Sequence, residues 1–275
     1  MRPRRFPVLL LLAVGVAARA DDGILYSFGA PKLMHGESTV RMVREFVSAK
    51  VYTAHADVYC RFVIRNDGPP VNARIGFPDG SDHIYEDGET PGPDMEDFRS
   101  RVDGNPVSTR VESPQAGSAQ ARFYHVKTVH FGPRQTRVIE DWYRGALSGG
   151  ATDAVLAARK GGHEGLYAME FEYVMESGGS WKGNISEATM RVDFMQKQVQ
   201  HLHAVPQAQF GSPEQPIMLK RLPRKNVVSW AGFSKPTVSG NRMVFRRRNF
   251  KPTEKDNVYL IFDWRRFNDS PWTKK

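Results

Sequence analysis

Hydrophobic residues take every second position between residues 56 and 64, and mostly polar residues separate them. A period of two residues is typical of a β-strand that buries one face. Residues 66–70 then interrupt the pattern with turn formers, among them Asn, Asp and Gly, which tolerate a positive φ. The predicted buried face of this strand consists of Ala56, Val58, Cys60, Phe62 and Ile64.

The segments on either side of that strand alternate in the same way, at 47–51 and at 71–78. Within 39–52 the parity of the hydrophobic positions changes near Glu45, which predicts a β-bulge or two partly covered faces. Three antiparallel strands with one apolar face need a second layer to cover that face. The pattern therefore predicts a β-sandwich, and it specifies no reaction.

Strand patterns continue along the rest of the chain, with almost no helix. The composition changes in the glycine-rich segment 145–165, where 152–160 has the pattern of two or three helical turns. Further strands are predicted at 98–102 and 107–112, which form a hairpin over 103–106, and at 123–131, 137–143, 167–175, 188–194, 227–230, 243–247 and 258–264.

We therefore predict an all-β protein made of two tandem antiparallel β-sandwich-like units. The expected divisions are a signal peptide at 1–20, an N-terminal β-sandwich at 21–145, a linker with the short helix at 146–165, and a C-terminal β-sandwich-like domain at 166–275.

The first 20 residues have the pattern of a secretory signal peptide. Three arginines precede an apolar stretch at 8–18, and this stretch is too short to span a bilayer comfortably. Ala18-Arg19-Ala20 supplies the small residues of a cleavage site. We expect an exported protein, periplasmic or extracellular after cleavage near Ala20, with no transmembrane segment in the mature chain.

The composition is ordinary for a globular protein, with 40% hydrophobic and 25% charged residues among 275. Loss of the four leader arginines reduces the formal charge from +9 to about +5, which does not predict nucleic-acid binding. Cys60 is the only cysteine, so no internal disulfide can form, and its inward position predicts a small buried side chain.

Several runs resemble known families. FVIRNDGPPVNARIGFPDG, which begins at Phe62, resembles the strand–turn–strand core of the vault/inter-α-trypsin-type sandwich. YVMESGGSWKGNISEATMRVD, from Tyr173, and NFKPTEKDNVYLIF, from Asn249, are similar to an exported bacterial family known only as a domain of unknown function. The resemblance implies an all-β exported protein and assigns no catalytic residue.

An acidic segment at 78–98 contains Gly and Pro but no Lys or Arg. Several carboxylates on one long loop can supply the six to eight oxygens that Ca²⁺ binds. The EF-hand spacing is absent, and a solvated acidic loop, or one that docks on basic strands, explains the same residues. The candidate calcium ligands are Asp79, Asp82, Asp87, Asp94 and Asp97.

Tryptophan residues and one pair of glutamates give further candidate functional residues. Trp181, in a Gly-rich segment, is the candidate exposed ligand-binding aromatic, whereas Trp142 and Trp230 are expected in the core. Glu170 and Glu172 share a strand face at a separation of roughly 7 Å, which suits a glycosidase pair and equally a solvated face.

Two clusters of basic residues are further candidate binding sites. His201 and His203 are spaced to share a strand face, either as metal ligands or as polar surface residues. A basic run at 246–248, with Lys251 and 220–225, gives either a cationic patch or scattered surface charge. In an exported protein the partner of such a patch is expected to be an anionic envelope polymer or a lipid headgroup rather than nucleic acid.

The sequence contains no nucleophile elbow, phosphate-binding glycine loop or HExxH motif. We therefore expect an exported, non-catalytic binding or structural module of the bacterial cell envelope. Its expected partner is an envelope component or another exported protein, and calcium is the only cofactor considered. Two alternatives stay open: a carboxylate-dependent enzyme or carbohydrate-binding protein acting on envelope polysaccharide, and a calcium-dependent adhesion module.

Overall fold

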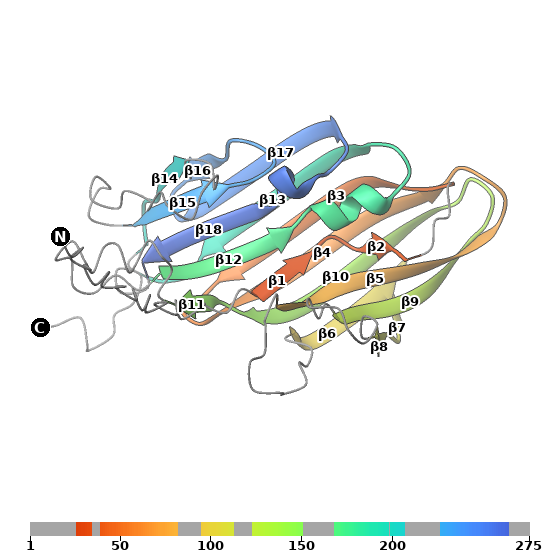
Figure 1. Ribbon diagram of the computed structural model, residues 1–275, viewed down its shortest axis with the longest axis horizontal. Coiled ribbons are helices and arrows are strands. Elements are labelled where there is room, and N and C mark those ends of the chain that lie inside the picture. The colour runs from red at the N-terminus through yellow and green to blue at the C-terminus, as the bar shows by residue number, and fades with distance from the viewer. Residues whose placement is uncertain are drawn as a thin grey trace, which may run out of the picture.

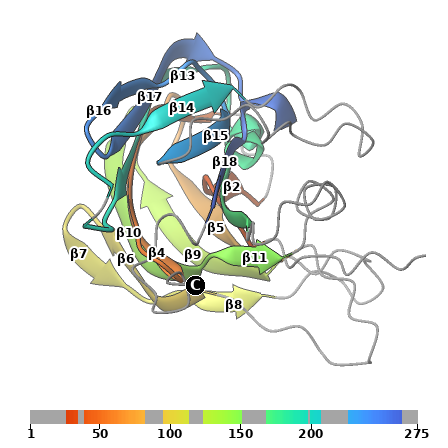
Figure 2. The same ribbon diagram turned by 90° about the vertical axis from the view of Figure 1, so that its left-hand side faces the viewer.

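Two β-sheets lie face to face in a sandwich (Figures 1 and 2). The computed structural model describes residues 26–34, 39–81, 95–112, 123–150, 168–197, 199–206 and 226–263. Helical structure in these ranges is limited to two 3₁₀ turns, η1 (Glu176–Ser180) and η3 (Glu254–Asp256). The predicted all-β class is confirmed. The predicted signal peptide and the predicted helix at 152–160 lie outside the described residues.

The ten-stranded sheet is the nearer layer in Figure 1. Its main path runs through β14 (His203–Pro206), β15 (Val227–Ala231), β18 (Val258–Asp263), β12 (Ala168–Val174), β1 (Tyr26–Gly29), β5 (Val71–Ser81), β9 (Phe123–Phe131) and β8 (Arg110–Glu112), while β11 (Ser148–Gly150) pairs with β12 and β2 (Lys32–Leu33) pairs with β5.

The eight-stranded sheet forms the far layer in Figure 1. Its order is β16 (Thr237–Ser239), β17 (Arg242–Phe250), β13 (Ile185–Phe194), β3 (Val40–Val51), β4 (His55–Asn66), β10 (Thr136–Ala146), β6 (Met95–Val102) and β7 (Asn105–Val107). The turn between β6 and β7 uses a positive φ at Asp103 and Gly104, as two-residue hairpins require.

The two halves of the chain share both sheets. β1 pairs in parallel with β12, and β3 pairs in parallel with β13, so each sheet runs without a break from the first half of the sequence into the second. One hydrophobic core contains buried residues of both halves, such as Phe62 and Phe245. The prediction of two separate tandem sandwiches is therefore corrected to one sandwich, because alternation shows which side chains face inward but not which strands pair.

The inward faces follow the predicted alternation. All five residues of the set Ala56 to Ile64 are buried, and Cys60 is fully buried as a free thiol. The register of β3 against β4 shifts between Met42 and Arg44, which is the predicted bulge. The bulge turns Glu45 into the core, where it is 2% exposed.

Candidate functional site: the arginine–aromatic face

The outer face of the eight-stranded sheet carries a row of aromatic side chains. Alternation directs Phe46 of β3, Tyr59 of β4 and Trp142 of β10 away from the core, and each is half-buried. Tyr59 lies directly opposite Trp142 in the strand register, with ring centres 5.2 Å apart. Phe46 meets Tyr59 edge-on at 6.3 Å. The three rings make a continuous strip across three adjacent strands.

Exposed arginines flank this strip, two of them on β6 and one on β4. The guanidinium carbon of Arg101 lies 5.3 Å from the centre of the Trp142 ring, within cation–π distance. Arg99 stands directly opposite Trp142 on β6, and Arg61 on β4 is exposed on the same face. Among the residues that the structure describes, no carboxylate lies within ion-pair distance of Arg61, Arg99 or Arg101.

Glu140 lies between Arg61 and Arg101 in the strand register. Its Oε1 atom accepts a hydrogen bond of 2.7 Å from the Tyr59 hydroxyl. Burial, reinforced by Glu140, raises the pKa of Tyr59 to about 12, so this hydroxyl keeps its proton and remains a donor at neutral pH. Glu140 is thus hydrogen-bonded to Tyr59, and in the described part of the chain it forms no ion pair with Arg61 or Arg101.

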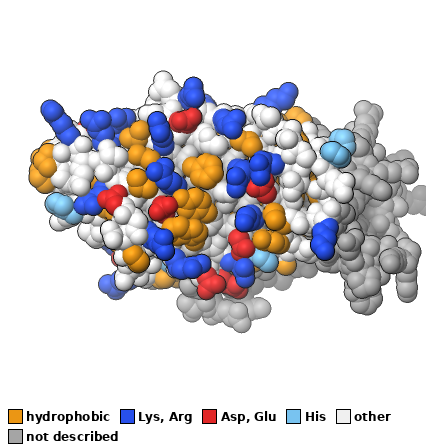
Figure 3. All heavy atoms as spheres, turned by 180° about the vertical axis from the view of Figure 1, so that it is seen from behind, with side chains coloured by type: hydrophobic (Ala, Val, Ile, Leu, Met, Phe, Trp, Pro, Cys, Tyr) orange, Lys and Arg blue, Asp and Glu red, His pale blue; other side chains and the backbone are white. Residues whose placement is uncertain are grey.

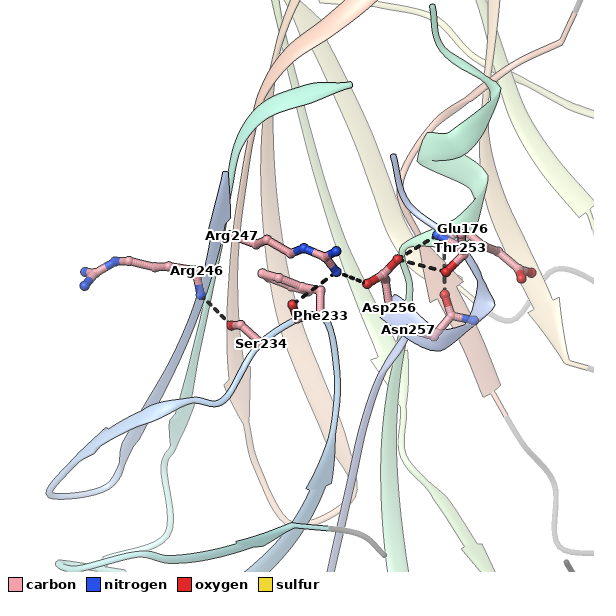
Figure 4. A network of polar contacts seen from close by, with 8 residues as sticks. All are labelled: Glu176, Phe233, Ser234, Arg246, Arg247, Thr253, Asp256 and Asn257. Carbon is pink, nitrogen blue, oxygen red and sulfur yellow. Dashed lines mark hydrogen bonds and ion pairs between the residues drawn. The ribbon is translucent and has the colours of Figure 1, made fainter. Parts of the chain in front are cut away.

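The opposite end of the face lies on β13 and β17. Figure 4 shows Arg246 and Arg247 pointing to opposite sides of β17. Arg247 pairs with Asp256 and covers the Phe250 ring at 4.6 Å, so it belongs to a network that includes the capping box of η3. Arg246 points outward, and Arg248 has the same parity with 81% of its side chain exposed. The predicted basic run therefore contributes two of its three arginines to the outer face.

Glu187 on β13 lies between two arginines, 3.5 Å from Arg248 and 3.9 Å from Arg44. We use the name arginine–aromatic face for the outer surface that spans β6 to β17 (Figure 3), where hydrophobic side chains lie in the middle and Lys and Arg surround them. Its defining residues are Arg44, Phe46, Tyr59, Arg61, Arg99, Arg101, Trp142, Arg246 and Arg248, with Glu140 and Glu187 between them.

A neighbouring row of charged residues on the same face is internally paired. Arg144 donates to Asp57 at 2.8 Å, and Arg242 donates to Asp193 at 2.5 Å. These pairs satisfy their own charges, so they contribute little attraction for a ligand. The arginine–aromatic face differs from this row because its Arg61, Arg99 and Arg101 form no ion pair with any carboxylate among the described residues.

Two of the predicted calcium ligands, Asp79 and Asp97, lie on strands. Asp79 ends the inward row of β5 and is fully buried: its Oδ1 accepts from the Met95 backbone N–H at 3.0 Å, and its Oδ2 lies 2.7 Å from His125 Nε2. Asp97 is exposed on β6. Asp82, Asp87 and Asp94 lie outside the described residues, so the calcium site stays a prediction.

Trp181 is buried, which corrects the expectation that it is an exposed ligand-binding aromatic. Its side chain is 1% exposed, and its Nε1 donates to the Pro31 carbonyl at 2.7 Å. The 3₁₀ turn η1 places it against Pro31, between β1 and β2, which the glycine-rich sequence did not reveal. Trp142 is also corrected, since it lies on the outer face, whereas Trp230 packs against the core as expected.

The other predicted pairs lie elsewhere on the sandwich. Glu170 and Glu172 alternate with inward residues of β12, so they face outward from the ten-stranded sheet. Burial and the charge of Glu172 raise the pKa of Glu170 to about 7. His201 precedes β14 and His203 begins it, and both are exposed. In the described part of the chain, no group of three or more His, Cys, Asp or Glu side chains is arranged to hold a metal ion.

Sequence reasoning missed a polar cluster inside the sandwich. Lys127 of β9 donates to Asp141 of β10 at 2.5 Å and to Ser100 of β6 at 2.8 Å, and all three are buried. His125 and Lys127 occupy the inward parity of β9, between Phe123 and Val129. The sequence indicated this cluster only through polar residues at positions of β9 whose alternation directs them toward the core. The arginine–aromatic face gave a weaker signal, since it depends on the register of β6 against β10.

Comparisons with known proteins address the fold. No family model matches the chain, and no curated protein is similar in sequence. A solved structure from Legionella pneumophila, named as a "putative nutrient binding protein", aligns with a TM-score of 0.56 at 16% identity, covering 87% of this chain and 70% of that one. At this identity the likeness shows a shared fold alone.

Two other solved structures align more weakly. An M1 zinc metallopeptidase from Deinococcus radiodurans gives a TM-score of 0.36 at 10% identity, and yeast LTA4 hydrolase gives 0.42 at 10% identity. This chain spans 42% of the first and 30% of the second. TM-scores this low carry no argument about this chain.

In the described residues, no helix has the length and hydropathy needed to cross a bilayer.

Proposed function

We propose that the protein is an exported, non-catalytic binding module of the bacterial cell envelope, and that it holds an anionic envelope polysaccharide on the arginine–aromatic face. The observation that carries this proposal is Arg101 stacked on Trp142, beside Arg61 and Arg99, with no carboxylate partner for any of the three in the described part of the chain. The leader-like sequence at 1–20 supports export.

The chemistry of the face suits carboxylate or phosphate groups. A guanidinium presents a planar fork of donors that can bind either group through two parallel hydrogen bonds. Stacking on Trp142 restricts Arg101 before the ligand arrives, so less side-chain entropy is lost on binding. The half-buried rings of Tyr59 and Trp142 add flat apolar surface between the cations.

A lipid surface is a poorer partner for this face. Membrane-surface binding needs large apolar side chains that enter the headgroup region. In the described residues the exposed large hydrophobic side chains are Val111, on β8 of the other sheet, and Met195, just beyond β13. The name of the Legionella protein refers to binding as well, although 16% identity supports only the shared fold.

Calorimetric titration of the mature protein with polygalacturonate, and with neutral dextran, tests the proposal. We expect binding of polygalacturonate that weakens as salt is raised, and no binding of dextran. The variant R99Q/R101Q should lose about tenfold or more in affinity, because two charge-assisted hydrogen-bonding groups are removed.

The matched control is R110Q/R134Q, which removes the same charge from two exposed arginines outside the face. Its affinity should stay within about twofold of the wild type, because long-range charge effects are screened. Equal losses in the two variants, or no polygalacturonate binding by the wild type, would overturn the proposal.

A second candidate is a carboxylate-dependent hydrolase that uses Glu170 and Glu172. The favouring observation is the pKa of Glu170, raised by burial to about 7, which suits a general acid beside a second carboxyl group. Release of reducing ends from polygalacturonate by the wild type, abolished in E170Q, would support this candidate. No release by the wild type would reject it and leave the binding proposal intact.

A further inference from the structure

The cations of the arginine–aromatic face reach from one side of the eight-stranded sheet almost to the other. Arg99 and Arg101 lie on β6, and Arg246 and Arg248 lie on β17. The path between them is β6-β10-β4-β3-β13-β17, which contains five intervals between neighbouring strands. At about 4.8 Å per interval, the two ends are roughly 24 Å apart. No single small anion can contact both ends.

Central arginines lie between those ends. Arg44 on β3 and Arg61 on β4 are exposed diagonal neighbours, because Arg44 pairs with Val63 and Arg61 pairs with Phe46 in the register. Side chains in diagonal positions on neighbouring strands lie about 7–8 Å apart at their backbones. The face therefore offers cations at both ends and in the middle, in a line that crosses the strands.

Carboxylates separate the three groups of cations. Glu140 on β10 lies between the β6 arginines and Arg61, and Glu187 on β13 lies between Arg44 and the β17 arginines. A carboxylate accepts hydrogen bonds and repels anions. A ligand that crosses this line must therefore combine repeated anionic groups with hydroxyl donors, as an acidic polysaccharide does and polyphosphate does not.

We infer that the ligand is a linear acidic polysaccharide that lies across the strands and contacts the arginines of β6 and of β17 at the same time. This inference rests on the proposed function, and it adds the direction of the chain, its minimum reach and its need for hydroxyl groups. Simultaneous contact at two ends raises affinity because the second contact is intramolecular.

The test is a length series of oligogalacturonates, measured by calorimetry on the wild type, R99Q/R101Q, R246Q/R248Q and the control R110Q/R134Q. For the wild type, affinity should rise steeply once the oligomer can reach roughly 24 Å. R246Q/R248Q should lose about tenfold in affinity for long oligomers, and clearly less for the disaccharide, which cannot contact both ends at once.

R246Q/R248Q is expected to fold like the wild type, because both β17 arginines are exposed. Its affinities can therefore be compared directly with those of the wild type. Arg248 forms its pair with Glu187 at the surface, so its loss is expected to cost little stability, and circular dichroism checks that the sheet is retained. Loss of binding in R99Q/R101Q but unchanged long-oligomer binding in R246Q/R248Q would overturn the inference and leave the proposed function standing. No binding of any oligomer by the wild type would overturn both.

Two further ligands test the chemistry. Polyphosphate should bind at least about tenfold more weakly than polygalacturonate of equal charge, because it has no donors for Glu140 and Glu187. Equal or tighter binding of polyphosphate would contradict the role of these carboxylates. Phosphatidylglycerol vesicles that bind as tightly as the polymer, with the same sensitivity to R246Q/R248Q, would replace the polysaccharide by a membrane surface.

Discussion

At Glu45, a single carboxyl group links the two sheets. The bulge in β3 turns it inward, and its Oε1 accepts a hydrogen bond of 2.9 Å from the hydroxyl of Tyr173 on β12. Its Oε2 is buried and has no hydrogen-bond partner among the described residues. Burial raises the pKa of Glu45 to about 7, so the protonated form is the one that the folded core favours.

Glu45 should make stability depend on pH. Its pKa is higher in the folded protein than in the unfolded chain, where it is close to 4.5, so the folded state binds the proton more tightly between these values. Stability is therefore lost as pH rises from about 4.5 to about 7, by about 3 kcal/mol in total, with no further loss above that.

The measurement is the free energy of unfolding in urea at pH 5 and pH 8, for the wild type and E45Q. Glutamine cannot ionise, so the difference between the two proteins should change by about 2–3 kcal/mol between pH 5 and pH 8. A pH dependence that is the same in both proteins would show that Glu45 is not its source.

Lys127 gives a second residue-scale prediction. K127M leaves Asp141 as a buried charge without its partner, which should destabilise the fold by about 3–5 kcal/mol. The double variant K127M/D141L should recover most of this loss, because it removes both charges. Chemical denaturation measures both values.

The control is R137Q, which breaks the more exposed Arg137–Asp103 pair. Its cost should be about 1 kcal/mol or less. If K127M lowered the free energy of unfolding no more than R137Q, the buried Lys127–Asp141 pair would not contribute more to stability than an exposed pair.

Among the secondary-structure elements, β1 joins the two halves in the ten-stranded sheet. Gly29 of β1 lies so close to β12 that an added Cβ would come within 2.6 Å of the Val174 Cβ and still closer to the Val174 carbonyl oxygen. G29A should therefore push these two strands apart and cost about 1–3 kcal/mol. Gly132 has room for a Cβ, with its nearest neighbour at 3.4 Å, and G132A is the control with an expected change below about 0.5 kcal/mol.

Thermal unfolding followed by circular dichroism compares the two glycine variants. A melting temperature for G29A equal to that of G132A would mean that the close contact between β1 and β12 is absent in solution.

Strand faces could be predicted from the sequence, and strand partners could not. The alternation from Ala56 to Ile64 and the parity change near Glu45 gave the inward positions correctly, because each depends on local periodicity. Pairing of β3 with β13 depends on contacts between residues more than 100 positions apart in sequence, which no local pattern encodes.

The sequence indicated the basic character of part of the candidate site, but not the position of the site. The basic run at 246–248 suggested an anionic envelope polymer, yet Arg247 turns inward to Asp256, and the rest of the face comes from β3, β4, β6 and β10. Trp181 failed as a candidate because glycine-rich sequence does not distinguish an open loop from a 3₁₀ turn packed on the core.

For the whole molecule, two continuous sheets around one core predict a single cooperative unfolding transition. Differential scanning calorimetry should give one peak whose calorimetric and van't Hoff enthalpies agree. Two separable transitions, one for each half of the chain, would contradict the shared sheets.

The claim that the outer face of the eight-stranded sheet is the ligand-binding surface is tested most directly by arginine footprinting with phenylglyoxal, read by mass spectrometry, with and without polygalacturonate. We expect the polymer to slow modification of Arg61, Arg99 and Arg101 several-fold, while Arg110 and Arg134 react at unchanged rates. Protection of Arg110 and Arg134 with unchanged reactivity of Arg99 and Arg101 would contradict it.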